Sequence, residues 1–357
     1  MGKRIERFIP SWFSVIMGTG ILPIALMLAS KWVPIYKPLA KGFFILSIVL
    51  FFIILVPWLL RFFMYPKAVK KDLFHPILGS FFPTMPISLL TLSVGFLTVG
   101  EHISFIGKPL AIQLATWLFI AGTIGIILLG LIILPIMFTG ESIDLQHANF
   151  GWFIPPVSHL FITIVGLDLI KYYPKSSAAD SLFLVSMIAL GIGIMLFIFV
   201  GAAVYHRYTY HELPASSIAS TFFIGMVPTA KVAIISVKAY GALAFTNYNF
   251  NMDVVHTLMK LTAIISWGFS IWWFVLAIIV LLEKIIKNDL PFALSWWAFA
   301  FPIGALAVST GAINKIMPNI MFPIILQILI VIFLLVWVTT LINTLIGIKN
   351  GSLFKQH

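Results

Sequence analysis

Ten long apolar stretches, separated by short polar segments, follow one another along this chain of 357 residues. About twenty apolar residues in a helix cross the hydrocarbon core of a bilayer, where no water can satisfy the backbone N–H and C=O groups. A helix satisfies these groups internally, so the sequence predicts an all-α integral membrane protein with a single transmembrane domain over residues 1–357. The predicted spans are residues 10–30, 39–64, 76–100, 109–138, 151–170, 181–204, 214–237, 255–282, 292–314 and 318–347.

The composition agrees with a chain that is solvated by lipid. Hydrophobic residues make up 61% and charged residues 9% of the chain, whereas a soluble domain is about 45–50% apolar and about a quarter charged. The chain has no cysteine, which excludes disulfides, thiolate catalysis and cysteine-based metal sites. The net charge of +11 comes from single or short groups of Lys and Arg between the apolar stretches. This distribution differs from the basic face of a nucleic-acid-binding domain, so we expect the lipid bilayer, and no nucleic acid, as a partner.

The distribution of basic residues also predicts an orientation. The N-terminal Lys3, Arg4 and Arg7 precede the first apolar stretch, which is longer than the apolar region of a signal peptide and is read as a retained first span. An even number of spans places both termini on the same side. With the N-terminus inside, more Lys and Arg residues flank the spans on the cytoplasmic side, as the positive-inside rule requires. We therefore expect a multi-pass protein of the cell membrane with both termini in the cytoplasm.

Prolines divide the ten spans into two classes. The odd-numbered spans begin at or next to a proline, and four of them also carry prolines further inside, where a proline removes a helical hydrogen bond and bends the helix. The even-numbered spans are mostly uninterrupted. This alternation predicts five helical hairpins, with bent odd-numbered helices inside around a pore and straight even-numbered helices outside. A general enrichment of proline in membrane helices would also produce interior prolines. The candidate bend residues are Pro23, Pro83, Pro86, Pro228 and Pro302.

Two motifs resemble one known family. Residues 8–13 (FIPSWF) with residues 17–20 (MGTG) are similar to the first helix, and residues 295–302 (SWWAFAFP) to the ninth helix, of the tellurite-resistance/dicarboxylate transporter family. This family includes plant slow anion channels, bacterial tellurite-resistance proteins, and fungal malate and sulfite transporters. The resemblance implies five inner helices around a narrow pore and a homotrimer with one pore per protomer. It also implies that a phenylalanine of the ninth helix plugs the pore, a role that falls on Phe301. Its implied substrates are chloride, nitrate, sulfite or C4-dicarboxylates, with proton coupling proposed for some members.

Several residues of the odd-numbered spans have a physical case of their own. Phe301 directly precedes Pro302, and a ring beside a flexing bend can open and close an apolar constriction, although core packing would also explain it. Lys231 lies within the seventh span, where a charge costs about 2.5–3.5 kcal/mol on insertion scales; it either serves function or reaches the interface by its long side chain. His159 could line the path or relay protons, or be a hydrogen-bonded structural residue. Further aromatic candidates for the pore lining, each also compatible with packing, are Phe81, Phe82, Phe161, Phe222 and Phe223.

The sequence therefore predicts a transporter of small anions, with Phe301 obstructing a central pore. The alternatives are a secondary carrier, with or without proton coupling, for malate or another C4-dicarboxylate, and a sulfite exporter. A polytopic membrane enzyme is a more remote alternative, because the chain has no nucleotide-binding, zinc-protease or nucleophile-elbow motif. No metal site, catalytic residue or cofactor is expected. Currents that reverse at the anion's equilibrium potential would indicate a channel, and dependence on a pH gradient would indicate a carrier.

Overall fold

The computed structural model describes residues 2–140, 143–211, 214–287 and 289–355, and within these ranges it contains helices and turns and no β-strand. Ten of the described helical segments are long and apolar enough to cross a membrane. The all-α class and the count of ten are therefore confirmed. The spans are Pro10–Ala29, Tyr36–Met64, Leu78–His102, Gly107–Thr139, Phe150–Ile170, Ser177–Tyr210, Ser216–Phe245, Met252–Ile286, Leu294–Ile316 and Met321–Lys349.

The observed bounds differ most from the predicted ones at the ends of the sixth and seventh spans. The sixth continues to Tyr210 and the seventh to Phe245, six and eight residues beyond the predicted ends at 204 and 237. The extra turn of the sixth span carries Tyr205, Arg207 and Tyr208. These side chains combine an apolar body with a polar tip, so they can continue a helix through the membrane interface although a hydropathy pattern ends before them.

Burial alternates strictly along the chain. The odd-numbered spans are 72–100% buried inside the protein, whereas the even-numbered spans are only 17–33% buried. The outer faces of the even-numbered spans expose large apolar side chains, among them Phe52, Leu131, Phe199, Ile265 and Leu335. Lipid can cover such faces without the cost that water would impose, so these five helices form an outer layer around the other five.

The five inner helices form a closed ring. They are α2 (Ser14–Ala29), α5 (Thr84–Thr98), α7 (Ile154–Ile170), α9 (Val227–Ala242) and α11 (Trp297–Ile316). Each packs against the next in this order, and α11 packs against α2. Each also packs against the helix that follows it in sequence, and these outer helices are α3 (Tyr36–Met64), α6 (Gly107–Thr139), α8 (Ser177–Tyr210), α10 (Met252–Ile286) and α12 (Met321–Lys349). Because one return span separates consecutive inner helices, all five run in the same direction.

Every inner helix is preceded by a short 3-10 segment. These segments are η1 (Pro10–Phe13), η2 (Leu78–Phe81), η5 (Phe150–Phe153), η6 (Ser216–Met226) and η8 (Leu294–Trp296). All five predicted bend prolines are buried within the inner spans, but their positions differ. Pro23 and Pro302 lie inside α2 and α11, whereas Pro83 directly precedes α5, and Pro86 and Pro228 lie in the first turns of α5 and α9. At these junctions the missing proline N–H costs little, because a first turn has no partner for it.

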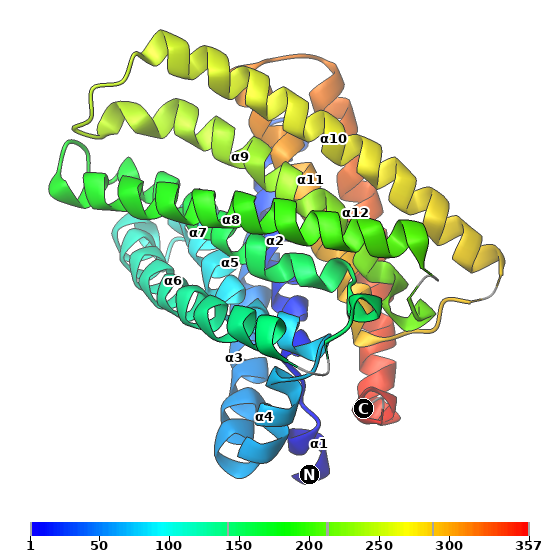
Figure 1. The fold of residues 1–357 in the computed structure, drawn as a ribbon. Helices are drawn as coiled ribbons and strands as arrows, with labels where there is room; N and C mark the ends of the chain where they lie inside the picture. The colour runs from blue at the N-terminus through cyan, green and yellow to red at the C-terminus, as the bar shows by residue number, and fades with distance from the viewer. Residues whose placement is uncertain (1, 141–142, 212–213, 288, 356–357) are drawn as a thin grey trace.

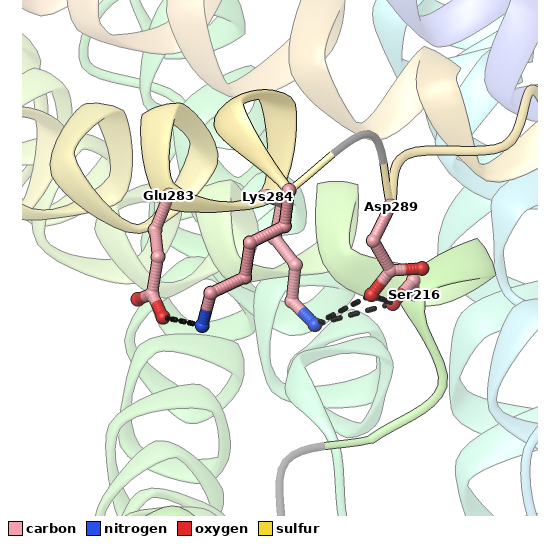
Figure 2. A network of polar contacts seen from close by, with 5 residues as sticks. Ser216, Glu283, Lys284 and Asp289 are labelled. Atoms are coloured by element: carbon pink, nitrogen blue, oxygen red, sulfur yellow. Dashed lines mark hydrogen bonds and ion pairs between the residues drawn. The ribbon is translucent and has the colours of Figure 1, made fainter.

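The two ends of the chain lie at the same end of the bundle, together with the short helices α1 (Gly2–Glu6) and α4 (Pro66–Leu73) (Figure 1). Arg61 of α3 fixes this corner: its Nε donates to the carbonyl of Glu6 at 2.8 Å, and its Nη2 lies 2.6 Å from Asp72 Oδ2. In another part of the structure, the end of α10 is tied to the start of η6, because Lys284 Nζ donates to Ser216 Oγ at 3.2 Å and to Asp289 at 3.1 Å (Figure 2). The start of the seventh span is thereby tied to the end of α10.

Candidate functional site

All five inner helices contribute to one central cavity of about 230 Å³. It lies in the middle and the carboxyl-terminal halves of the five inner spans, toward the end of the bundle remote from the N-terminus. Its wall is mostly aliphatic but includes three lysines and one aspartate. The lining residues are Ile21, Ile24, Leu28, Val94, Thr98, Phe161, Ile164, Asp168, Lys231, Ile234, Val237, Lys238, Ala305, Val308, Ala312 and Lys315.

The deepest ionisable side chain in this cavity is that of Lys231 of α9, a residue that is only 2% exposed. Its Nζ lies 3.3 Å from the ring centroid of Phe161 and 5.3 Å from that of Phe301. Within the described ranges no carboxylate or hydrogen-bond acceptor reaches it. A cation over aromatic rings gains about 2 kcal/mol when desolvated, which falls well short of the cost of removing an ammonium group from water. In its charged form, this side chain is not satisfied by the described residues around it, and an anion beside it would stabilise that form.

A second group of charges lies closer to the surface. Lys238 of α9 forms an ion pair with Asp168 of α7, with Nζ and Oδ2 2.5 Å apart, and Lys315 lies exposed at the end of α11. A neighbouring cavity of about 350 Å³ shares Ile24, Leu28, Thr98 and Lys315 with the central cavity and extends to Lys31 and Lys171. The lysines are exposed at the mouth and buried at Lys231, and they outnumber the two carboxylates of these cavities, Glu101 and Asp168. The passage is therefore a cationic funnel.

A cavity of about 470 Å³ lies at the opposite end of the ring, where the inner spans begin. It is lined by residues of η1, η2, η6 and η8 and of the segments beside them, including Ser11, Phe81, Ser217 and Ser295. His75 at this mouth accepts the backbone N–H groups of Ile77 and Leu78 through Nδ1, at 3.1 and 3.2 Å. Burial lowers the pKa of His75 below its usual value, against the opposing effect of Asp72. A neutral ring is what this hydrogen-bonding requires.

Phe301 lies in the stretch of α11 between the two cavities. From Ser295, which lines one cavity, to Ala305, which lines the other, the helix advances ten residues, or about 15 Å. Phe301 is 5% exposed and lies one turn before Ala305. Around it, α2 and α11 approach closely: a methyl group added to Gly18 would lie 2.8 Å from Trp297. The stretch of α11 around Phe301 is therefore closely packed.

The other predicted lining residues divide into two groups. Phe161 lines the central cavity and Phe81 lines the cavity at the opposite end. Phe82, Phe222 and Phe223 face outward. Phe82 packs on Trp58 of α3 at 5.6 Å between ring centroids, Phe222 stacks on Trp273 of α10 at 5.3 Å, and Phe223 lines a lipid-side groove with Phe299.

His159 also faces outward. A methyl group on Gly130 of α6 would lie 3.2 Å from its Cε1, and its Nδ1 donates to the carbonyl of Pro155 at 2.9 Å. It is not among the residues that line the central cavity. This placement fits the structural histidine that the sequence left open as an alternative to a residue of the path.

The Asp168–Lys238 pair is the feature that sequence reasoning missed, because Asp168 lies near the end of the predicted span 151–170 and Lys238 directly follows the predicted span 214–237. One signal could have found them. Asp168 follows Phe161 by seven residues, and Lys238 follows Lys231 by seven, so each shares a helical face with a cavity residue. The sequence does not show that α7 and α9 are neighbours, so it could not predict that Asp168 and Lys238 form a pair.

A family profile described as "Voltage-dependent anion channel" (SLAC1) matches residues 7–345. The chain belongs to the voltage-dependent anion channel family. The resemblance to the tellurite-resistance and slow anion channel family, seen in the first and ninth spans, is thereby confirmed.

Relatives within the voltage-dependent anion channel family cover most of this chain. Two uncharacterized transporters of Methanocaldococcus jannaschii are 36% and 35% identical, over 87% and 88% of this chain and 85% and 87% of their own. A sulfite efflux pump of Arthroderma otae is 25% identical, over 90% of this chain and 85% of its own. The names of these relatives indicate membrane transport, and the family is one of anion transporters.

Proposed function

We propose that this protein passes small anions along the axis of the inner ring, with Lys231 as a binding residue and Phe301 as the obstruction. The observation that carries the proposal is the ammonium group of Lys231, buried between the rings of Phe161 and Phe301 in a cavity formed by all five inner helices. An anion is the ligand that satisfies this group. Membership of an anion-transporter family supports the same conclusion.

The chemistry of the wall suits transport better than retention. A permeating ion must bind strongly enough to enter and weakly enough to leave. Lys231 supplies one positive charge at the deepest point, where the wall around it is apolar, and the two other lysines, Lys238 and Lys315, lie nearer the mouth. Movement of the Phe301 ring, beside the bend at Pro302, would then connect the two cavities and let the anion advance.

Purified protein in liposomes tests the proposal. We expect uptake of at least one of chloride, nitrate, sulfite and malate, and we expect Lys231→Met to reduce its initial rate about tenfold or more. Lys231→Arg, which keeps the charge, should retain more of the flux. Lys260→Met is the matched control, because Lys260 also lies within a span but on the outer helix α10, over Tyr240. Wild-type liposomes without anion flux, or equal fluxes for the two methionine variants, would contradict the proposal.

Export of sulfite is a second candidate, favoured by the similarity to fungal sulfite efflux pumps over nine tenths of this chain. A proton-coupled carrier of malate or another C4-dicarboxylate remains the third. The same liposomes separate these functions. A pH gradient that drives accumulation indicates a carrier, whereas currents that reverse at the equilibrium potential of the anion indicate a channel.

The implied assembly and location belong to this proposal too. We expect a homotrimer with one path per protomer, and a multi-pass protein of the cell membrane with cytoplasmic termini. Catalysis is not part of the proposal: His75 lies at the opposite end of the ring from Asp168 and Glu101, which line the two neighbouring cavities, and His159 packs against α6, so these four titratable groups do not converge on one cavity.

A further inference from the structure

The inner helices α7 and α9 carry two matched pairs of residues across the central cavity. Phe161 and Asp168 lie seven residues apart on α7, and Lys231 and Lys238 lie seven residues apart on α9. Seven residues are two helical turns, so each helix places its two side chains on one face, about 10 Å apart. The two helices run in the same direction, and the pairs therefore lie at two levels, a deeper one at Lys231 and an outer one at Lys238.

The two levels differ in what faces the lysine. At the deeper level, Lys231 Nζ lies 3.3 Å from the centre of the uncharged Phe161 ring. At the outer level, Lys238 Nζ lies 2.5 Å from Asp168 Oδ2, with the two side chains 20% and 11% exposed. The outer lysine is thus already occupied by an anion, and that anion belongs to the protein itself.

We propose that Asp168 is a specificity-determining residue: its carboxylate occupies Lys238 and sets the charge that a mobile anion meets on its way to Lys231. This inference rests on the proposed function of the cavity. Three lysines and one aspartate line the cavity, so its formal charge is +2. A mobile anion must compete with Asp168 for Lys238 and is repelled by the carboxylate. Because Coulomb energy is proportional to the charge of the anion, a dianion feels Asp168 twice as strongly as a monoanion.

Four forms of the protein separate charge from structure. Asp168→Asn raises the formal charge of the cavity to +3, Lys238→Met lowers it to +1, and the double variant returns it to +2. The measurement is the concentration of malate that halves chloride flux into liposomes. We expect Asp168→Asn to lower this concentration about tenfold and the half-saturating chloride concentration only about threefold. Lys238→Met should shift both in the opposite direction, and the double variant should resemble the wild type.

The sign of the two single changes decides the question. If the pair only braces α7 against α9, both single variants will lose flux and stability together and will shift malate inhibition in the same direction, which overturns the inference. Equal malate inhibition in all four forms, with normal chloride flux, also overturns it and leaves the proposed function intact. A wild-type protein that passes no anion removes both. If Asp168→Asn does not fold, Asp168→Glu replaces it, because it keeps the negative charge. The inference then requires that malate inhibits chloride flux in Asp168→Glu as in the wild type, and inhibits it less in Lys238→Met.

Discussion

The side chains of Phe299 and Phe301 lie two residues apart on α11, are equally buried at 5% exposure, and face different surroundings. Phe301 approaches Lys231 and the central cavity, whereas Phe299 packs on Phe223, with ring centroids 5.1 Å apart, beside a groove on the lipid side. The same residue type thus belongs to the candidate path in one case and to ordinary packing in the other. This pair offers a direct test of the obstruction.

We expect Phe301→Ala to raise the resting anion flux of the protein in liposomes several-fold, because removing the ring opens space between the two cavities and uncovers Lys231. Phe299→Ala is the control. Both substitutions remove a buried ring and should cost a similar stability of about 3–5 kcal/mol, measured as the loss in thermal midpoint in detergent. A resting flux that is unchanged in Phe301→Ala, or raised equally in both variants, would remove Phe301 as the gate.

Sequence alone could not distinguish such residues. The inner helices are buried all round, so their apolar residues show no one-sided pattern that would indicate which face meets the cavity. Phe81 and Phe161 line the two cavities at the ends of the ring, while Phe82 and Phe222 pack on outer helices and Phe223 lines the lipid-side groove. Lys231 was identifiable because a charge inside a span is costly wherever it points.

The elements themselves were more predictable than their faces. Ten spans follow from hydropathy, because length and apolarity are properties of each segment alone. The 3-10 segment that precedes each inner helix was not predicted. A 3-10 turn and an α-turn differ by little in local energy, so the choice depends on the neighbours of each segment. At η6 (Ser216–Met226), for example, Trp273 of α10 donates from Nε1 to the carbonyl of Phe222.

The contact between α2 and α11 depends on a glycine. A methyl group at Gly304 would lie 2.3 Å from Ile21 Cγ2 and 2.8 Å from Phe333 Cε1. Gly304→Ala therefore forces α11 away from α2 beside the cavity, and we expect a loss of about 1–3 kcal/mol and a lower thermal midpoint. Gly191→Ala on the outer helix α8 is the control, because nothing lies within 4 Å of the added methyl group. Equal thermal midpoints for the two variants would show that the inner ring tolerates the displacement.

The whole molecule has two unlike mouths. One is cationic, with Lys31, Lys171 and Lys315 above the Lys238–Asp168 pair. The other is lined by serines, aliphatic residues and His75, whose pKa is lowered by burial. Anions approaching from the two sides therefore meet different electrostatic potentials, and the direction in which the protein sits in the membrane decides which compartment faces the cationic funnel.

The absence of cysteine from the chain makes that direction measurable. Exposed positions are available at both ends of the bundle. Lys67 of α4 and Lys355 lie at the end that holds the two chain termini, and Asn249 lies between α9 and α10 at the opposite end. Because an even number of spans separates the termini and the basic residues favour the cytoplasm, a membrane-impermeant maleimide should label Asn249→Cys in intact cells. It should label Lys67→Cys and Lys355→Cys only after permeabilisation. The reverse pattern would invert the orientation and turn the funnel toward the cytoplasm, while labelling of Lys67→Cys without Lys355→Cys would contradict the even number of spans.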